Sequence, residues 1–286
     1  MTAWTGEAAR RRLAALADPA RSDIPAARIA VVVAHPDDET IGIGAQLPRL
    51  TGVTIVHVTD GAPRNMADAA ALGFSNPEGY AAARRRELKA AMALAGVPPE
   101  ALVGPWVSDQ EAAVNLGGIA RRLSALLAER RIEAVVTHAY EGGHPDHDAC
   151  AFAVHAAAAL VARDGAPPPA IVEMPLYHAG PDGRAMQRFP ALSVVETHEI
   201  MLALGDEARR LKARMYAAHQ SQGRVLAMFS CEAERFRAAP AYDFTALPNG
   251  GRLLYEQHDW GMTGARWQAL ARAAIEELGL EAGPWR

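Results

Sequence analysis

The stretch that decides the fold is Ile29–Gly44, IAVVVAHPDDETIGIG, in which an apolar run leads directly into the cluster His35-Pro36-Asp37-Asp38-Glu39. A short continuous apolar run predicts a strand buried on both faces, with the polar cluster at the edge of the sheet. His35 and Asp38 stand three residues apart at the start of the next segment, so both side chains can face one point, whereas Asp37 points elsewhere. This spacing is typical of metal ligands. One imidazole and one carboxylate leave a tetrahedral metal site incomplete, so the hypothesis requires a further ligand from another part of the chain.

The composition is that of an ordinary globular protein. The 286 residues are 50% hydrophobic and 22% charged, which excludes a disordered chain and suffices for one large α/β domain with or without an appendage. Lys and Arg number 29 against 33 Asp and Glu. Because this balance supplies no basic field for a phosphate backbone, we expect no nucleic-acid partner.

The chain carries no pattern that predicts membrane insertion. Its longest apolar stretch, residues 149–162, is interrupted by His155 and is shorter than the ~20 residues that span a bilayer. Residues 1–23 lack the sustained apolar segment of a signal peptide. Cys150 and Cys231 stand far apart without a CxxC, which favours two reduced thiols. We therefore expect a cytoplasmic protein.

Apolar runs and helical periodicities alternate along the chain. We expect strands at 27–34, 52–59, 101–107, 132–138, 170–177 and 193–200. We expect helices at 5–17, 40–50, 79–95, 116–131, 145–163, 205–220 and 264–278, with a shorter helical stretch at 225–239. This alternation predicts an α/β fold with a Rossmann-like, mostly parallel sheet flanked by helices, because parallel strands are joined by crossover helices.

The alternation weakens past Tyr177. We divide the chain into a Rossmann-like core at 1–200 and a helical C-terminal portion at 201–286 packed on that core, and a single domain is compatible with the same pattern. Ligands of parallel α/β sheets bind beyond the carboxyl ends of the strands. That rule places the first cluster, Asp60-Gly61 and residues 138–147 along one edge.

A second cluster, His144-Pro145-Asp146-His147, repeats the pattern of the first. Two glycines free the backbone before it, its proline suits the first helical turn, and its two histidines stand three residues apart. His35, Asp38 and one of these histidines supply two nitrogens and one oxygen and leave a position open for water, which is the pattern of a catalytic zinc site. The spacing does not decide which histidine is the ligand, and two unrelated polar turns are the alternative interpretation.

AHPDDE at 34–39 followed by HPDH at 144–147 resembles the PIG-L or LmbE-like family of zinc-dependent N-acetylglucosaminyl deacetylases. The resemblance extends to further segments: Thr59–Ala62, Arg84–Leu88, Lys212 and His219-Gln220-Ser221-Gln222. It implies three zinc ligands, His35, Asp38 and His147. It also implies that Asp37 is the general base, that His144 stabilises the oxyanion or protonates the leaving amine, and that Asp146 orients a histidine. The implied metal would lower the pKa of its bound water toward ~7 and polarise an acyl carbonyl. Iron or cobalt would suit the same donors.

The implied substrate is a small-molecule N-acyl amino sugar or glycoside that loses its acyl group, most simply acetyl. Two departures bear on this expectation. Gly42–Ala45 keeps only part of a GxGG-like run, and Gly142 stands where family members that act on a thiol-sugar carry a tyrosine, for which Tyr140 is the candidate substitute. The alternatives are an amidase that cleaves thiol-sugar conjugates and a non-catalytic sugar-binding or metal-binding module. A homo-oligomer is compatible with the sequence.

Other polar residues have two interpretations each. Arg84 and Asp60 are candidates for binding the sugar, although Arg84 also suits a solvated helix face and Asp60 a turn. His138 either orients a metal ligand or is a satisfied histidine at a strand end. We interpret His219 as a residue that makes a structural hydrogen bond, and a role in substrate binding is the alternative. The sequence leaves the role of His258 open.

Overall fold

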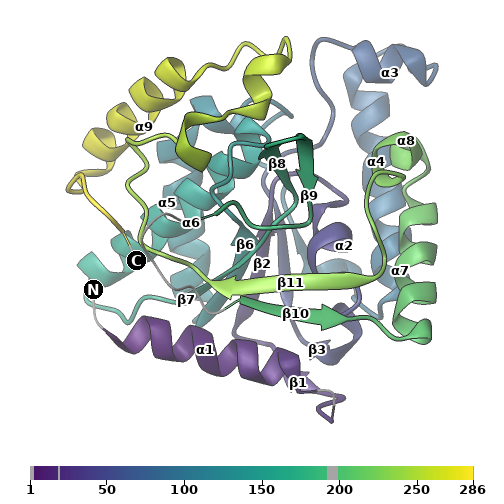
Figure 1. The fold of residues 1–286 in the computed structure, drawn as a ribbon, viewed down its shortest axis with the longest axis horizontal. Coiled ribbons are helices and arrows are strands. Elements are labelled where there is room, and N and C mark those ends of the chain that lie inside the picture. Colours follow the sequence, from purple (N-terminus) through teal and green to yellow (C-terminus); the bar gives the residue numbers. More distant parts are fainter. Residues whose placement is uncertain (1–2, 19, 192–198, 286) are drawn as a thin grey trace.

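The computed structural model describes residues 3–18, 20–191 and 199–285 (Figure 1). Its centre is a seven-stranded sheet in the order β10-β11-β7-β6-β2-β4-β5. The strands are β2 (Ile29–Val33), β4 (Thr54–His57), β5 (Leu102–Val103), β6 (Ala134–His138), β7 (Ala170–Met174), β10 (Glu199–Ala203) and β11 (Ala233–Ala238). The strands from β7 to β5 run parallel, whereas β11 and β10 are antiparallel to their neighbours. The predicted mostly parallel α/β sheet is confirmed.

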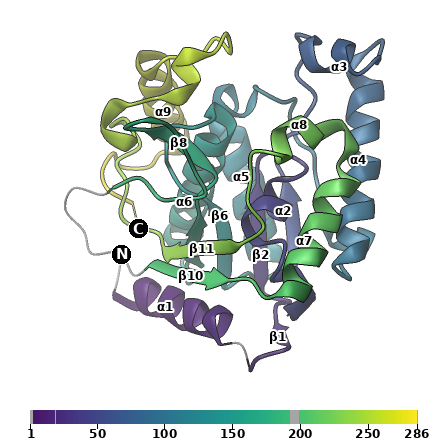
Figure 2. The same ribbon diagram turned by 45° about the vertical axis from the view of Figure 1, so that its right-hand side comes forward.

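Helices cover both faces of this sheet (Figure 1 and Figure 2). They are α1 (Ala3–Ala17), α2 (Asp38–Ile43), α3 (Ala67–Ala71), α4 (Pro77–Leu94), α5 (Leu116–Glu129), α6 (Pro145–Arg163), α7 (Asp206–Ala218), α8 (Gly223–Leu226) and α9 (Gly264–Leu278). Short 3₁₀ turns lie at Leu47–Arg49, Pro99–Ala101, Ala112–Val114, Gln220–Gln222, Asn249–Gly251 and Leu254–Gln257. Two small sheets complete the fold, β1 (Ile24–Pro25) with β3 (Leu50–Thr51), and the hairpin β8 (Tyr177–Gly180) with β9 (Gly183–Met186).

The central strand β2 shows why the sheet has two hydrophobic cores. Val32 packs into the core that contains α5, α6 and α9, whereas Val31 and Val33 pack into the core that contains α1, α4 and α7. Successive strand side chains point to opposite faces, so a strand covered on both sides must be apolar throughout. All five residues of β2 are buried accordingly.

One sequence prediction is wrong. Residues 225–239 are not a helical stretch: α8 ends at Leu226, and residues 233–238 form β11. In AERFRA the residues Glu234 and Phe236 are buried, and the strand pairs with both β7 and β10. Pairing with a sheet edge has overridden the helix propensity of Ala, Glu and Arg.

Two other elements are much shorter than predicted. The helix predicted at 40–50 is α2, which ends at Ile43, and the strand predicted at 101–107 shortens to β5. The strand predicted at 193–200 falls largely outside the described residues. The division at residue 200 stays a prediction, and β11 lies inside the main sheet although it follows that boundary. Within the described residues, no helix combines the length and the apolarity that crossing a membrane requires.

Candidate metal centre

The two His-Pro-Asp clusters meet because β2 and β6 are neighbours in the sheet and run parallel. The first cluster follows β2 and opens α2, and the second follows β6 and opens α6. Asp37 precedes α2 with a φ of 143°, in the region that glycine favours. Backbone strain of this kind persists where the surroundings enforce it and is frequent at functional sites. The backbone N–H of His35 donates to Asp38 Oδ2 at 2.7 Å, which fixes the second carboxylate of the cluster.

Asp38 lies close to two other predicted site residues, His35 and His147. His35 Nδ1 lies 3.2 Å from Asp38 Oδ2, and His147 Nε2 lies 3.4 Å from Asp38 Oδ1. Two atoms bound to one tetrahedral zinc ion at ~2.0–2.1 Å lie roughly 3.3 Å apart. The side chains of all three residues are buried. In the described residues, the groups whose donor atoms lie close enough to share an ion combine His35 with His144 and His147, and Asp38 with His138 and His147. A single ion shared by His35, Asp38 and His147 stays a prediction.

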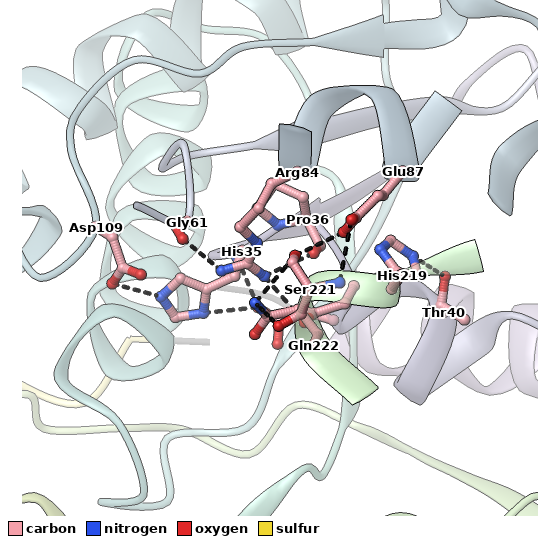
Figure 3. Close-up of polar contacts among 12 residues, drawn as sticks. His35, Pro36, Thr40, Gly61, Arg84, Glu87, Asp109, His219, Ser221 and Gln222 are labelled. Carbon is pink, nitrogen blue, oxygen red and sulfur yellow. Dashed lines mark hydrogen bonds and ion pairs between the residues drawn. The ribbon is translucent and has the colours of Figure 1, made fainter. Parts of the chain in front are cut away.

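The far side of His35 faces carboxylates. Its Nε2 lies 3.2 Å from Asp109 Oδ1 and 3.4 Å from Asp146 Oδ2 (Figure 3 shows His35 beside Asp109). A metal-bound histidine usually presents its second ring nitrogen to a carboxylate, which fixes the tautomer and the ring. His147 Nδ1 is buried and has no hydrogen-bond partner among the described residues. These contacts fit a metal bound through His35 Nδ1.

The geometry distinguishes the two histidines that the sequence left equivalent. His144 precedes α6, and its Nδ1 accepts a hydrogen bond from the backbone N–H of Asp146 at 3.1 Å. His147 instead directs Nε2 at Asp38. The contacts therefore favour His147 as the third candidate ligand and leave His144 beside the candidate site, with its ring centroid 4.7 Å from that of His35.

His138 also approaches Asp38, with Nε2 at 3.4 Å from Oδ2. That nitrogen accepts a hydrogen bond from the backbone N–H of Ala34 at 3.0 Å, so its lone pair is already engaged. The ring stacks on His147 at a centroid distance of 4.2 Å. His138 thus contacts a candidate ligand and is not suited to be one itself.

Asp37 is paired with Arg84. The guanidinium donates to Asp37 Oδ2 at 2.9 Å and to the carbonyl oxygens of Pro36 and Gly61 (Figure 3). Burial raises the pKa of Asp37 to about 8, although the Arg84 charge opposes this shift. A carboxylate that titrates near neutral pH suits general acid-base chemistry. The predicted role of Arg84 in sugar binding stays a prediction, since the described contacts are internal.

Asp60 makes its described contacts within a turn and with the segment of Asp109. Its carboxylate accepts hydrogen bonds from the backbone of Ala62 at 3.0 Å and of Asp109 at 3.1 Å, and from Arg64 Nη2 at 2.6 Å. These are the contacts of a turn residue. Asp60 also lines a cavity of 280 Å³ together with Pro36 and Arg85, and its role toward a sugar stays a prediction.

Asp109 is the site residue that the sequence analysis missed. It is buried, which disfavours its charged form, but the neighbouring His35 holds the pKa of its carboxyl below the ordinary value. The signal was available, because Asp109 follows the third predicted strand at the same carboxyl edge. Asp146 anchors this segment by accepting the backbone N–H groups of Gln110 at 2.6 Å and Ala112 at 3.1 Å.

The late motif His219–Gln222 packs behind the centre. Ser221 Oγ donates to Glu87 Oε2 at 2.6 Å, and Gln222 Nε2 donates to the hydroxyl of Tyr80 at 2.6 Å. His219 Nε2 lies 3.4 Å from Thr40 Oγ1 (Figure 3). The motif therefore joins the end of α7 to α4 and α2.

Comparison with known proteins supports the resemblance. Residues 30–158 match the family described as PIG-L: GlcNAc-PI de-N-acetylase. Two curated relatives, from Kineococcus radiotolerans and a Nocardioides species, are both named 1D-myo-inositol 2-acetamido-2-deoxy-alpha-D-glucopyranoside deacetylase. The first is 32% identical over 182 residues, which are 53% of this chain and 50% of the relative. The second is 32% identical over 165 residues, 47% of this chain and 55% of the relative. The chain spans about half the length of these relatives.

Solved structures share the fold. A deacetylase of teicoplanin biosynthesis superimposes with a TM-score of 0.55 at 18% identity, over 73% of this chain and 96% of that chain. N,N'-diacetylchitobiose deacetylase from Pyrococcus horikoshii gives a TM-score of 0.51 at 18% identity, over 100% of this chain and 92% of that chain. At these identities the likeness is one of architecture.

Proposed function

Since residues 30–158 belong to the PIG-L family, we propose that the chain is a metal-dependent hydrolase that removes an N-acyl group, most simply acetyl, from an amino sugar or glycoside. The observation that carries the proposal is the approach of His35 Nδ1 and His147 Nε2 to the two oxygens of Asp38, at 3.2 and 3.4 Å, beside the Asp37 carboxylate. Metal binding alone would require only the first three residues.

His35, Asp38 and His147 would hold the metal. We propose zinc, and iron or cobalt would suit the same two nitrogens and one oxygen. When bound, the ion supplies an acidified water and polarises the acyl carbonyl. Asp109 and Asp146, at 3.2 and 3.4 Å from His35 Nε2, would orient the first of these ligands.

Asp37 would act as the general base. Arg84 donates to one oxygen of the Asp37 carboxylate, which fixes the position of that group. Asp37 would take the proton of the attacking water and pass it to the leaving amine as the amide bond breaks.

His144 would donate a hydrogen bond to the oxyanion, the first of the two roles that the resemblance implies for it. Its Nδ1 accepts the backbone N–H of Asp146, so the proton of the neutral ring lies on Nε2. Burial lowers the pKa of His144 to about 3, which keeps the ring neutral near pH 7. A neutral N–H donor in a buried site suits oxyanion stabilisation. Asp146 would thus orient His144 through its backbone and His35 through its side chain.

An amidase that cleaves thiol-sugar conjugates is the weaker candidate. The suggested substitute for the missing tyrosine, Tyr140, donates its hydroxyl to the carbonyl oxygen of Ala246 at 2.8 Å, and its ring packs against Phe244 and Trp267. Tyr140 is therefore a core residue and does not replace a tyrosine at position 142.

The test combines metal analysis with acetate release. We expect about one zinc per chain, no acetate from a panel of N-acetyl amino sugars after chelation, and recovery on adding zinc. Asp37→Asn should retain the metal and lose turnover, whereas Asp164→Asn, at the exposed end of α6, should change neither. Full turnover of metal-loaded Asp37→Asn would refute the assigned base. Sugar binding without acetate release would support a non-catalytic module, and release of a mercapturate-like fragment from a thiol-sugar conjugate would favour the amidase.

A further inference from the structure

Six side chains form a closed circuit beside the candidate metal centre. We call this circuit the collar; its members are His144, His147, Tyr177, Arg184, His258 and Trp260. The ring centroids of His147 and Tyr177 are 5.3 Å apart, and the Arg184 guanidinium lies 6.0 Å from the Tyr177 ring. Arg184 Nη2 contacts His258 Nε2 at 2.9 Å, and His258 stacks on Trp260 at 4.3 Å. Trp260 lies 4.5 Å from His144, which closes the circuit, since His144 and His147 are 5.2 Å apart.

The collar joins separate parts of the chain. Its two histidines belong to the start of α6, Tyr177 and Arg184 to the hairpin β8–β9, and His258 and Trp260 to the segment after the last 3₁₀ turn. The match to the PIG-L family ends at residue 158. Tyr177, Arg184, His258 and Trp260 therefore lie outside the segment that carries the proposed catalytic residues. His144 and His147 lie within it.

Arg184 is a cation with spare hydrogen-bond donors. It is exposed, and in the described part of the chain its side-chain contacts are neutral acceptors, His258 Nε2 and Met228 Sδ, with no carboxylate at ion-pair distance. Two other arginines near the centre already form ion pairs, Arg84 with Asp37 and Arg64 with Asp60. A guanidinium presents a planar fork of donors that matches a carboxylate or a phosphate.

His258 supports this reading of Arg184. Burial, and next the charge of Arg184, lower the pKa of His258, so the ring is neutral near pH 7 and accepts a hydrogen bond without adding positive charge. The contact orients the guanidinium and leaves its charge uncompensated. On the other side of His258, the half-buried ring of Trp260 offers a rigid apolar surface next to His144. Binding sites for small molecules combine such surfaces with a few placed polar groups.

We propose that the collar is the subsite for the part of the substrate beyond the acylated amine, that this part carries a carboxylate or phosphate bound by Arg184, and that the sugar ring packs against Trp260. This assignment rests on the proposed function, because it requires the acylated nitrogen to lie at His144. It makes the preferred substrate an anionic amino sugar or an amino sugar with an anionic substituent.

Binding of product-like sugars tests the subsite without requiring turnover. We would titrate zinc-loaded protein by calorimetry with glucosamine, glucosamine 6-phosphate, glucosamine 1-phosphate and muramic acid, using wild type, Arg184→Met, Arg184→Lys and the control Arg210→Met on the exposed face of α7. Wild type should prefer at least one anionic sugar to glucosamine. Arg184→Met should weaken the binding of that preferred ligand by about tenfold or more, because one charge-assisted pair is lost. It should weaken the binding of glucosamine by less than about twofold. Arg184→Lys should retain part of the preference, and Arg210→Met all of it.

Two outcomes of the binding experiment would overturn the subsite. If Arg184→Met weakened the binding of neutral and anionic sugars equally, Arg184 would only support the structure of the collar. If wild type bound anionic sugars no more tightly than glucosamine, the proposed anionic group would be wrong. The ranking of phosphate over carboxylate, or the reverse, identifies the group. Acetate release from the N-acetylated forms of the same sugars is measured separately. Arg184-dependent binding without release would refute the proposed function and retain the subsite, and release without Arg184 dependence would do the opposite.

Discussion

The ion pair between Lys212 of α7 and Glu234 of β11 is wholly buried, and it bears on the position of α2. Lys212 Nζ lies 2.7 Å from Glu234 Oε1 and donates to the carbonyl oxygen of Ile41 at 2.7 Å. Glu234 also accepts the backbone N–H of Ala45 at 2.8 Å and the side chain of Gln46 at 3.0 Å. The pair therefore ties α7 and β11 to the end of α2, whose first residue is the candidate ligand Asp38.

Replacing Lys212 with Met would leave the Glu234 carboxylate in the interior with its two remaining donors. Removing one partner of a buried pair costs about 3–5 kcal/mol, because the other charge stays desolvated. We therefore expect Lys212→Met to lower the free energy of unfolding by about 3–5 kcal/mol.

Urea unfolding at pH 7 measures this change against the control Arg210→Met, which removes an exposed charge from the same helix and should stay within about 0.5 kcal/mol of wild type. The double variant Lys212→Met, Glu234→Gln removes both charges and keeps an acceptor for Ala45. It should be more stable than Lys212→Met alone. A single variant within 1 kcal/mol of wild type, or a double variant less stable than the single one, would refute the argument from charge burial.

Three further outcomes follow from the contacts. Asp109→Asn should lower the affinity for zinc by about 10- to 100-fold in a chelator competition, because Asp109 lies 3.2 Å from His35 Nε2, and unchanged affinity would contradict that role. Gly143→Ala should lower the melting temperature and abolish turnover, because its Cβ would collide with the carbonyl oxygen of Tyr177, whereas Gly118→Ala meets open space on α5 and should be harmless or slightly stabilising. Burial lowers the pKa of His155 to about 3, so the stability that the neutral ring contributes is complete above pH 6.5 and is lost as the pH falls toward 3. Metal-free wild type should therefore lose about 2 kcal/mol more than His155→Leu between pH 7.5 and pH 5, and equal losses would count against the shift.

The sequence was sufficient where the signal is local. The uninterrupted apolar run of β2 and the three-residue spacing of His144 and His147 depend only on neighbouring residues, so strand, turn and candidate ligands could be predicted. Spacing alone left the choice between the two histidines open, and the resemblance implied His147. In the structure, the backbone N–H of Asp146 engages His144 Nδ1. β11 was missed since its helix-like composition is overridden by pairing with β7 and β10.

The candidate metal ligands and the proposed sugar-binding residues differ in the same way in how local sequence patterns encode them. The candidate metal ligands follow β2 and β6, two adjacent parallel strands, and adjacent strand ends are what a repeating βαβ pattern brings together. Arg184 and Trp260 come from a hairpin and an irregular segment that no periodicity encodes. Segments of this kind can change without disturbing the sheet. We therefore expect exchange of the β8–β9 hairpin between relatives to alter which sugar binds and to leave metal affinity unchanged. A large loss of zinc affinity in such a chimera, measured by chelator competition, would show that the collar and the metal centre are not separable.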